Sequence, residues 1–281
     1  DNLAWGREEH IARLSDVDQF TFENIDVTET DLVKDAIDRH EITSIFHLAA
    51  LHFIPAAVKD PSLTVRINSL GTQSMLDAIR GSKVERFAFT STGDVYSPSD
   101  APHREDEGIG PFNIYGLSKL HGEHLIELAQ RETNAKFLVA RVFNLYGTRE
   151  TNPHIVPEIV EQLKAKTSAL RLGDLKPRRD MVPVDDAARA IVEALGTVTD
   201  PITTVNLATG KAHSMSDVVA ALLKYSMTDT KIETDPAKLR PSERMHLEAD
   251  VSRLKNLIGW TPSADLDAGI QKLIEDEGFN S

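Results

Sequence analysis

Tyr115 and Lys119 are the side chains whose types and spacing could do chemistry, because they stand four residues apart in the run NIYGLSKLHGEHLIELAQ. On a helix, residues i and i+4 lie one turn apart on the same face, so an ammonium group can lie beside a phenol. A nearby cation favours the phenolate and lowers the phenol's pKa from about 10 toward working pH. The pair could therefore act as a general base or acid on a hydroxyl group.

Two hydroxyl residues, Ser91 and Thr92, close the apolar run RFAF shortly before that helix. If RFAF is a parallel strand, its carboxyl end faces the ligand crevice, and Thr92 could share the hydrogen of a bound hydroxyl. The tyrosine–lysine spacing alone is a weak signal, since the chain has 4 Tyr and 31 Lys+Arg and such pairs arise by chance. The position of the pair just after this strand strengthens the interpretation.

Short β-rich runs alternate with segments of helical period through the first half of the chain. This alternation predicts an α/β fold with a doubly wound parallel sheet and helices on both faces. The predicted strands are residues 19–26, 44–51, 86–92 and 136–144, and the predicted helices are residues 30–40, 62–81 and 113–130.

Beyond Asn144 the sequence changes to loops that contain Pro and Arg, which predicts a smaller, partly interleaved C-terminal α/β lobe. A strand-like run at 203–210 precedes a helix that begins at Ser214, with Asp217 completing a variant of the capping box. We expect a cofactor-binding domain at 1–145, to which 180–210 returns, and a substrate-binding lobe at 146–179 and 211–281.

The composition excludes several function classes. A formal net charge of -13 opposes binding to nucleic acid, and no apolar run reaches the roughly 18–20 residues that a membrane span needs. With no cysteine, the chain has no disulfide, no thiolate metal site and no cysteine nucleophile. We expect neither a nucleic-acid nor a membrane partner, and we take the cytoplasm as the default location.

Seven motifs in order resemble one family: HLAAL, INSLGTQSML, FTSTGDVY, YGLSK, RVFNLYG, RRDMVPVDDAARAI and LRPSE. The chain resembles the extended short-chain dehydrogenases/reductases, the nucleotide-sugar epimerases and dehydratases, over essentially its whole length. The resemblance implies a Rossmann-type sheet, NAD as cofactor and a nucleotide-diphosphate sugar as substrate. It makes Thr92 the catalytic hydroxyl, Tyr115 the acid/base, and Lys119 an ammonium that also holds the nicotinamide ribose.

The resemblance also implies further cofactor contacts. Asp26 and Val27 would flank the adenine ring, and a solvated turn residue is the alternative for Asp26. Asn68 would order the helix that carries Lys119, or it could bridge buried backbone groups. The strand end that would lie under the dinucleotide is formed by Leu48, Ala49 and Ala50. Val142 would lie beside the nicotinamide. We interpret His47 as a core histidine.

On the substrate side, Asn144 resembles the residue that contacts the diphosphate, and Arg179 and Arg240 resemble the two arginines that clamp it. Either arginine could instead form a surface ion pair. The same resemblance places Ile155 at the substrate, and Glu243 would hold a nucleotide ribose. His121 and His124 lack carboxylate or thiolate partners in the sequence, so we predict no metal site.

The chain starts at DNLAWGREEH, and no glycine-rich dinucleotide fingerprint occurs in it. In the family, this stretch resembles the one that follows the second strand, so Asp1 would be the acid that binds the adenosine ribose. An acid there repels a 2′-phosphate, which favours NAD over NADP. We expect a longer protein to supply the first strand and the glycine-rich turn, about thirty residues in length by the family pattern; a chain that truly starts here is the alternative.

The residues after Thr92 separate the possible reactions. A 4,6-dehydratase or a decarboxylase would carry an acidic side chain there, generally Glu, whereas this chain has Gly93 and the shorter Asp94. We therefore predict an NAD-dependent nucleotide-sugar 4-epimerase that works through a 4-keto intermediate, with a dehydratase or decarboxylase as the alternative. A non-catalytic NAD-binding sensor or a structural fragment stays open. The resemblance also implies a homodimer formed through a four-helix bundle of residues 69–81 and 115–130.

Overall fold

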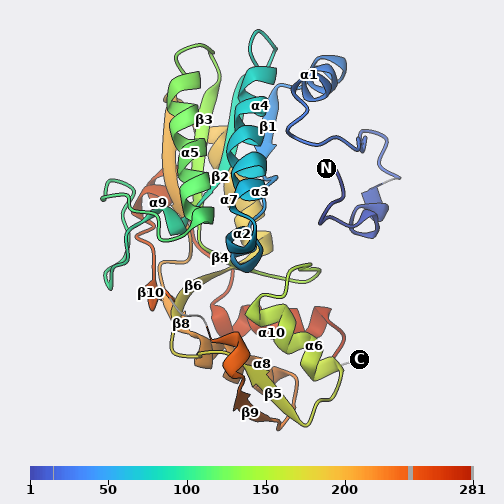
Figure 1. Ribbon diagram of the computed structural model, residues 1–281, viewed down its shortest axis with the longest axis vertical. Helices are drawn as coiled ribbons and strands as arrows, with labels where there is room; N and C mark the ends of the chain where they lie inside the picture. The colour runs from blue at the N-terminus through green and yellow to red at the C-terminus, as the bar shows by residue number, and fades with distance from the viewer. Residues whose placement is uncertain (15, 240–242, 280–281) are drawn as a thin grey trace. The chain divides into compact units, whose positions relative to one another are not determined.

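The first half of the chain alternates strands with helices, in a computed structural model that describes residues 1–14, 16–239 and 243–279 (Figure 1). The main sheet has the strand order β1-β2-β3-β7, and β1 and β2 pair in parallel with Phe46 opposite Ala88. A helix intervenes between β2 and β3, which is the crossover that parallel neighbours need. The strands are β1 (Ser44–His47), β2 (Arg86–Thr92), β3 (Lys136–Val142) and β7 (Ile202–Leu207).

Helices pack against this sheet because their apolar stripes match its buried side chains. Phe87, Phe89 and Phe137 from the strands share one core cluster with Ile37, Leu76 and Ile126 from the helices. The helices are α1 (Thr30–Arg39), α2 (Ile54–Lys59), α3 (Pro61–Val65), α4 (Gly71–Ala78) and α5 (Ile114–Ala129), with a π-helical turn at Arg66–Leu70.

Residues 19–26 form no strand, so that prediction was wrong. The run has the β-rich composition of a strand, but a strand must exchange backbone hydrogen bonds with a neighbour. β1 pairs only with β2 in the described part of the sheet. The composition therefore indicated that residues 19–26 favour an extended backbone. It could not indicate whether a neighbouring strand would lie beside them.

The remaining elements form smaller sheets and their own core. β6 pairs in parallel with β4 and β10 and antiparallel with β8, while β5 pairs in parallel with β9. The predicted capping box at Ser214 and Asp217 is present at the start of α8. The elements are β4 (Asn144–Tyr146), α6 (Ile155–Lys164), β5 (Ala169–Leu172), β6 (Arg178–Pro183), α7 (Val184–Thr197), β8 (Ala212–Ser214), α8 (Met215–Tyr225), β9 (Lys231–Thr234), β10 (His246–Leu247), α9 (Ser252–Ile258) and α10 (Leu266–Asp276).

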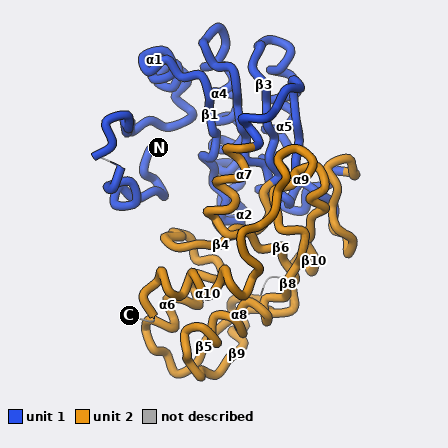
Figure 2. Tube along the Cα trace, turned by 180° about the vertical axis from the view of Figure 1, so that it is seen from behind, with its two compact units in different colours: residues 1–97, 109–141, 194–205 blue, residues 98–108, 142–193, 206–281 orange. Residues whose placement is uncertain are grey.

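Backbone contacts divide the chain into two compact units (Figure 2). The first comprises residues 1–97, 109–141 and 194–205, and the second comprises residues 98–108, 142–193 and 206–281. The separate cofactor and substrate roles assigned to the predicted domains stay a prediction. None of the described helices is long and apolar enough to cross a bilayer.

Gly122 lets α5 approach the sheet closely, since a Cβ atom there would lie 2.4 Å from Cζ of the buried Phe89. We expect Gly122→Ala to lower the free energy of unfolding by about 1–3 kcal/mol, because overpacking of a core outweighs the gain in helix propensity. Urea denaturation followed by circular dichroism measures the change.

Gly196→Ala on α7 is the matched control, because its Cβ would meet nothing closer than 3.9 Å, an Arg86 nitrogen. This variant should be neutral or more stable by up to about 1 kcal/mol. Equal effects of the two substitutions would contradict the close-approach explanation.

Candidate active site

The hydroxyl of Thr92 lies at the carboxyl end of β2, where it meets the phenol of Tyr115 at the start of α5. The Thr92 hydroxyl lies near enough to the phenol to lower its pKa as a hydrogen-bond donor, and Thr92 Oγ1 accepts the backbone N–H of Asp94 at 3.2 Å. α5 begins here because the side chain of Asn113 accepts the N–H of Gly116 at 2.8 Å as an N-cap. The structure thus brings two of the three predicted catalytic side chains into contact.

Gly116 permits this approach, since a Cβ atom there would lie 2.4 Å from the backbone oxygen of Asp94. The start of α5 can therefore pack directly on the 93–95 turn that follows Thr92. Any larger residue at this position would push the turn, and with it Thr92, away from Tyr115.

Lys119 lies one turn further along α5 and is only 2% exposed. Its ammonium lies 4.6 Å from the centre of the Phe89 ring. Burial lowers the pKa of Lys119 to about 7, although the charge of Glu123 acts in the opposite direction. Within the described residues, Lys119 Nζ forms no hydrogen bond or ion pair, so its N–H donors can serve a ligand.

The pKa of Tyr115 is raised above its ordinary value, which corrects the expected lowering by Lys119. Burial of the phenol has the largest effect and the charge of Asp94 adds to it, while the hydrogen bond from Thr92 acts in the opposite direction. Burial disfavours the charged forms of both Tyr115 and Lys119, so the neutral phenol is favoured.

Asn68 connects the helix of Tyr115 and Lys119 to the segment after β1. Its side chain accepts the N–H of Leu51 at 2.7 Å and donates to the Leu51 carbonyl at 3.0 Å and to Ser118 Oγ at 2.9 Å. Asn68 therefore bridges buried backbone groups and also holds α5, so both roles considered for it from the sequence are compatible with the structure. Its contribution to cofactor binding stays a prediction.

The other predicted cofactor residues of the first unit lie on loops. Asp26 accepts hydrogen bonds from Thr28 and from Asn2, and these lower the pKa of its carboxyl. Asp1 is exposed and accepts the N–H of Leu3 at 2.6 Å. Val27 packs at the start of α4 against Gly71, and Leu48, Ala49 and Ala50 follow the end of β1.

His47, at that strand end, is buried and shares a hydrogen bond of 3.1 Å with Thr72. Burial and the nearby charge of Lys119 lower its pKa to about 3, so the ring is neutral. This environment agrees with the interpretation of His47 as a core histidine.

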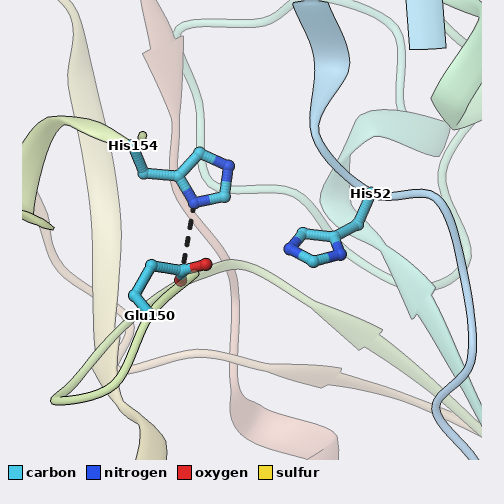
Figure 3. A group of neighbouring side chains, drawn as sticks. All are labelled: His52, Glu150 and His154. Atoms are coloured by element: carbon cyan, nitrogen blue, oxygen red, sulfur yellow. Dashed lines mark ion pairs between the residues drawn. The ribbon is translucent and has the colours of Figure 1, made fainter. Parts of the chain in front are cut away.

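Apart from Thr92, the predicted substrate residues that the structure describes lie in the second unit. Arg179 on β6 forms an ion pair with Glu243, so these two predicted contacts face each other. Asn144 begins β4 just after Val142, Ile155 begins α6, and Arg240 lies outside the described residues. Before α6, His154 Nδ1 and a Glu150 oxygen form an ion pair at 3.5 Å; Figure 3 draws them with His52, which belongs to the first unit.

Sequence reasoning missed Glu123 and Arg141, which form a buried ion pair in the first unit. A signal was present in the sequence, because Arg141 interrupts the apolar run KFLVARVF and Glu123 follows Lys119 by four residues. A charge within a buried strand needs a partner, and the inward face of the neighbouring helix is where that partner can lie.

Comparison with known proteins shows extended similarity. A family model described as GDP-mannose 4,6 dehydratase matches residues 1–273. A putative UDP-glucose 4-epimerase from Methanocaldococcus jannaschii is 29% identical over 279 residues, which cover 98% of this chain and 88% of the relative.

Solved structures confirm the predicted α/β fold. The UDP-glucose 4-epimerase of Thermotoga maritima, solved with UDP-glucose, has a TM-score of 0.89 and 26% identity over 98% of this chain and 88% of that one. The corresponding Thermus thermophilus enzyme, solved with NAD, has a TM-score of 0.88 and 26% identity over 99% and 89% of the two chains. By the extent of these matches, the chain belongs to the GDP-mannose 4,6 dehydratase family of extended short-chain dehydrogenases/reductases.

Proposed function

We propose that this protein is an NAD-dependent nucleotide-sugar 4-epimerase that works through a 4-keto intermediate. The observation that carries the proposal is the juxtaposition of the Thr92 hydroxyl and the Tyr115 phenol at the strand end, one helical turn from the buried Lys119. The three groups supply a proton acceptor, a hydrogen-bond partner and a positive charge, which is what oxidation of a sugar hydroxyl requires.

The residues present fit a nicotinamide dinucleotide. Lys119 forms no hydrogen bond with a described residue, so its N–H donors can serve a ligand, and a ribose diol has the matching acceptors. Ala49 and Ala50 have small side chains, which leave room for a ligand above the strand end. NAD, when bound, would supply reversible oxidation of the sugar carbon, and Lys119, Asp26 and Asn68 are among the residues that would hold or support it.

Tyr115 would take the proton of the sugar 4-hydroxyl at its phenolate oxygen, while Thr92 hydrogen-bonds to the same sugar oxygen. A phenol with a raised pKa is a strong base once deprotonated, but its phenolate needs a nearby positive charge. Lys119 would supply that charge. After the keto sugar has rotated in the site, its C4 would take back a hydride on the other face from the reduced cofactor, and Tyr115 would return the proton to the sugar oxygen. These two transfers would complete epimerisation without any further acid or base.

A nucleotide-sugar 4,6-dehydratase is the second candidate, and Asp94 is the observation that favours it. The charge of Asp94 raises the pKa of Tyr115, so a carboxylate acts on the phenol from the turn that follows Thr92. Elimination of water needs such a carboxyl group. Gly93 beside it has no side chain, and for this reason we place the epimerase first.

We expect the purified protein, supplied with NAD, to convert a UDP-hexose such as UDP-glucose or UDP-N-acetylglucosamine into its 4-epimer. Product analysis by NMR should show no loss of the 6-hydroxyl group. Formation of only a 4-keto-6-deoxy sugar, from these substrates or from GDP-mannose, would replace the epimerase with the dehydratase.

Tyr115→Phe is the matched variant, because it removes one hydroxyl and keeps the ring. It should reduce turnover at least about 100-fold while leaving the Kd for the nucleotide sugar within about twofold, since general acid–base catalysis contributes factors of this size. A wild-type protein that binds both ligands and turns over no substrate would favour a non-catalytic sensor.

Lys119→Met should stabilise the fold, by about 1–4 kcal/mol at pH 6.5, because the buried ammonium is replaced by an apolar chain of similar length. The folded pKa lies near 7 and the unfolded value is 10.5, so the unfolded chain binds more protons between these values. The cost of burying the ammonium is therefore full below pH 7 and falls as the pH rises toward 10.5. Urea denaturation at pH 6.5 and 9.5 measures this change.

Lys34→Met on α1 is the control, since Lys34 is exposed and pairs with Asp38 at 3.3 Å. It should change stability by less than about 1 kcal/mol at both pH values. A Lys119→Met variant with the same small and pH-independent effect would show that the ammonium is well solvated.

We also propose that the protein forms a homodimer through exposed apolar side chains on the turn before α4 and on α5. Leu70 precedes α4 and is 59% exposed, and Leu128 on α5 is 58% exposed. Leu128→Glu should convert a dimer into a monomer in analytical ultracentrifugation, because a charge in an apolar interface is strongly unfavourable. Val192 on α7 is 57% exposed, so Val192→Glu is the matched control and should leave the dimer intact. A monomeric wild type would refute the proposal.

A further inference from the structure

A buried ion pair lies immediately behind the proposed catalytic residues. Glu123 on α5 and Arg141 on β3 are each 6% exposed. Arg141 donates from Nε to one carboxylate oxygen of Glu123 at 3.1 Å and from a terminal nitrogen to the other at 2.8 Å. The pairing is therefore bidentate, which fixes the orientation of both side chains.

Two further contacts extend this pair to both ends of the segment that contains Thr92. The hydroxyl of Ser91, the residue before Thr92, donates to the Glu123 carboxylate. Arg141 donates to the hydroxyl of Tyr96 at 3.0 Å, and its guanidinium lies 4.9 Å from the centre of the Tyr96 ring. The strand end, the 93–95 turn and α5 are thus connected through one carboxylate and one guanidinium.

Stability alone is a poor explanation for this arrangement. A buried ion pair often contributes little net stability, and apolar residues of similar volume can replace it without loss. Apolar residues could not, however, fix the direction of the Ser91 hydroxyl or of the Tyr96 ring. Glu123 also stands one helical turn from Lys119, so its carboxylate is the opposite charge on the same helix face.

We propose that Glu123, held by Arg141, is a positioning residue for the reaction proposed above: it fixes the Thr92 strand end against α5 and keeps Lys119 in its charged form. Ser91 and Tyr96 connect the ion pair to the two ends of the segment that contains Thr92. Glu123, Arg141, Ser91 and Tyr96 need not touch the substrate. The proposal rests on the proposed function for its kinetic consequences, but its effect on Lys119 can be measured without turnover.

Other ionisable groups near Lys119 must be considered before any pH effect is assigned to Glu123. His47 on β1 is neutral, Tyr115 is protonated at neutral pH, and Asp94 lies on the 93–95 turn next to the phenol. Apart from Arg141, the charged side chains on the other elements packed against α5 are exposed or partly exposed; these are Lys59, Arg66, Asp77, Arg86 and Lys136. Glu123 is thus the buried carboxylate that faces the ammonium.

The test compares Glu123→Gln with the wild type. Glutamine keeps the shape and can still accept from Ser91, but it removes the negative charge and leaves Arg141 uncompensated. Both changes should make Lys119 lose its proton at lower pH, by about one pH unit. Labelling of Lys119 with an amine-directed reagent across pH, located by peptide mass mapping, measures this shift in the apo protein and does not depend on turnover.

In the kinetic arm, kcat of Glu123→Gln should fall at least about 10-fold with KM within about twofold, because the missing positioning acts on the transition state. The alkaline limb of the pH profile should move to lower pH with it. Ser91→Ala removes only the hydroxyl contact, so it should lower kcat a few-fold without moving Lys119. A wild type with no epimerase activity would refute the proposed function, while the labelling arm would still decide whether Glu123 keeps Lys119 charged.

The double variant Glu123→Gln/Arg141→Met covers the case in which the single variant fails to fold, because it removes the uncompensated guanidinium. A stable double variant with low kcat and an acid-shifted Lys119 would support the proposal. Full kcat, or an unshifted Lys119 in either variant, would overturn it and leave the ion pair a structural feature only.

Discussion

Burial of the Lys119 ammonium is the constraint around which the first unit is arranged. An ammonium removed from water loses hydration, and this loss must be offset by its surroundings. The face of the Phe89 ring at 4.6 Å provides a favourable cation–π contact, and Glu123 provides an opposite charge one turn away. His47 must then remain neutral, since a second buried cation there would be unfavourable, and its hydrogen bond with Thr72 satisfies the ring without a charge.

The π-helical turn at Arg66–Leu70 also helps to hold the helix that carries Lys119. An extra residue in a helical turn changes which side chains face inward, and such turns often occur at functional sites. Here the turn carries Asn68, whose amide satisfies both backbone groups of Leu51 and reaches Ser118. Ser118 lies between Tyr115 and Lys119 in sequence, so one amide connects the loop after β1 to the helix that carries these two residues.

Elements with a local cause were predictable from the sequence. The helix over 113–130 is observed as Ile114–Ala129, the strand at 86–92 is observed at the same residues, and the capping box at Ser214 is present. Periodicity, apolar runs and caps are properties of neighbouring residues, which is why they could be read directly. The tyrosine–lysine pair followed from the same helical period.

Features that depend on distant parts of the chain were not predictable in this way. Residues 19–26 have the composition of a strand but no pairing neighbour among the described strands. The direction of the Tyr115 pKa shift depends on how deeply the phenol is buried and on Asp94, and neither can be derived from the i, i+4 spacing. Arg141 and Glu123 are 18 positions apart, and only the packing of α5 on β3 brings them together.

The buried ion pair also explains why charge can be maintained so close to an apolar core. Glu123 accepts from Ser91 and from two nitrogens of Arg141, so its carboxylate is solvated by fixed donors instead of water. Fixed donors do not need to reorganise when charge moves nearby, which is the property that favours catalysis in enclosed sites. A pair of apolar residues could fill the same volume and give an equally stable helix–strand contact. It would leave the Thr92 strand end without a directional restraint and the Lys119 ammonium without a counter-charge.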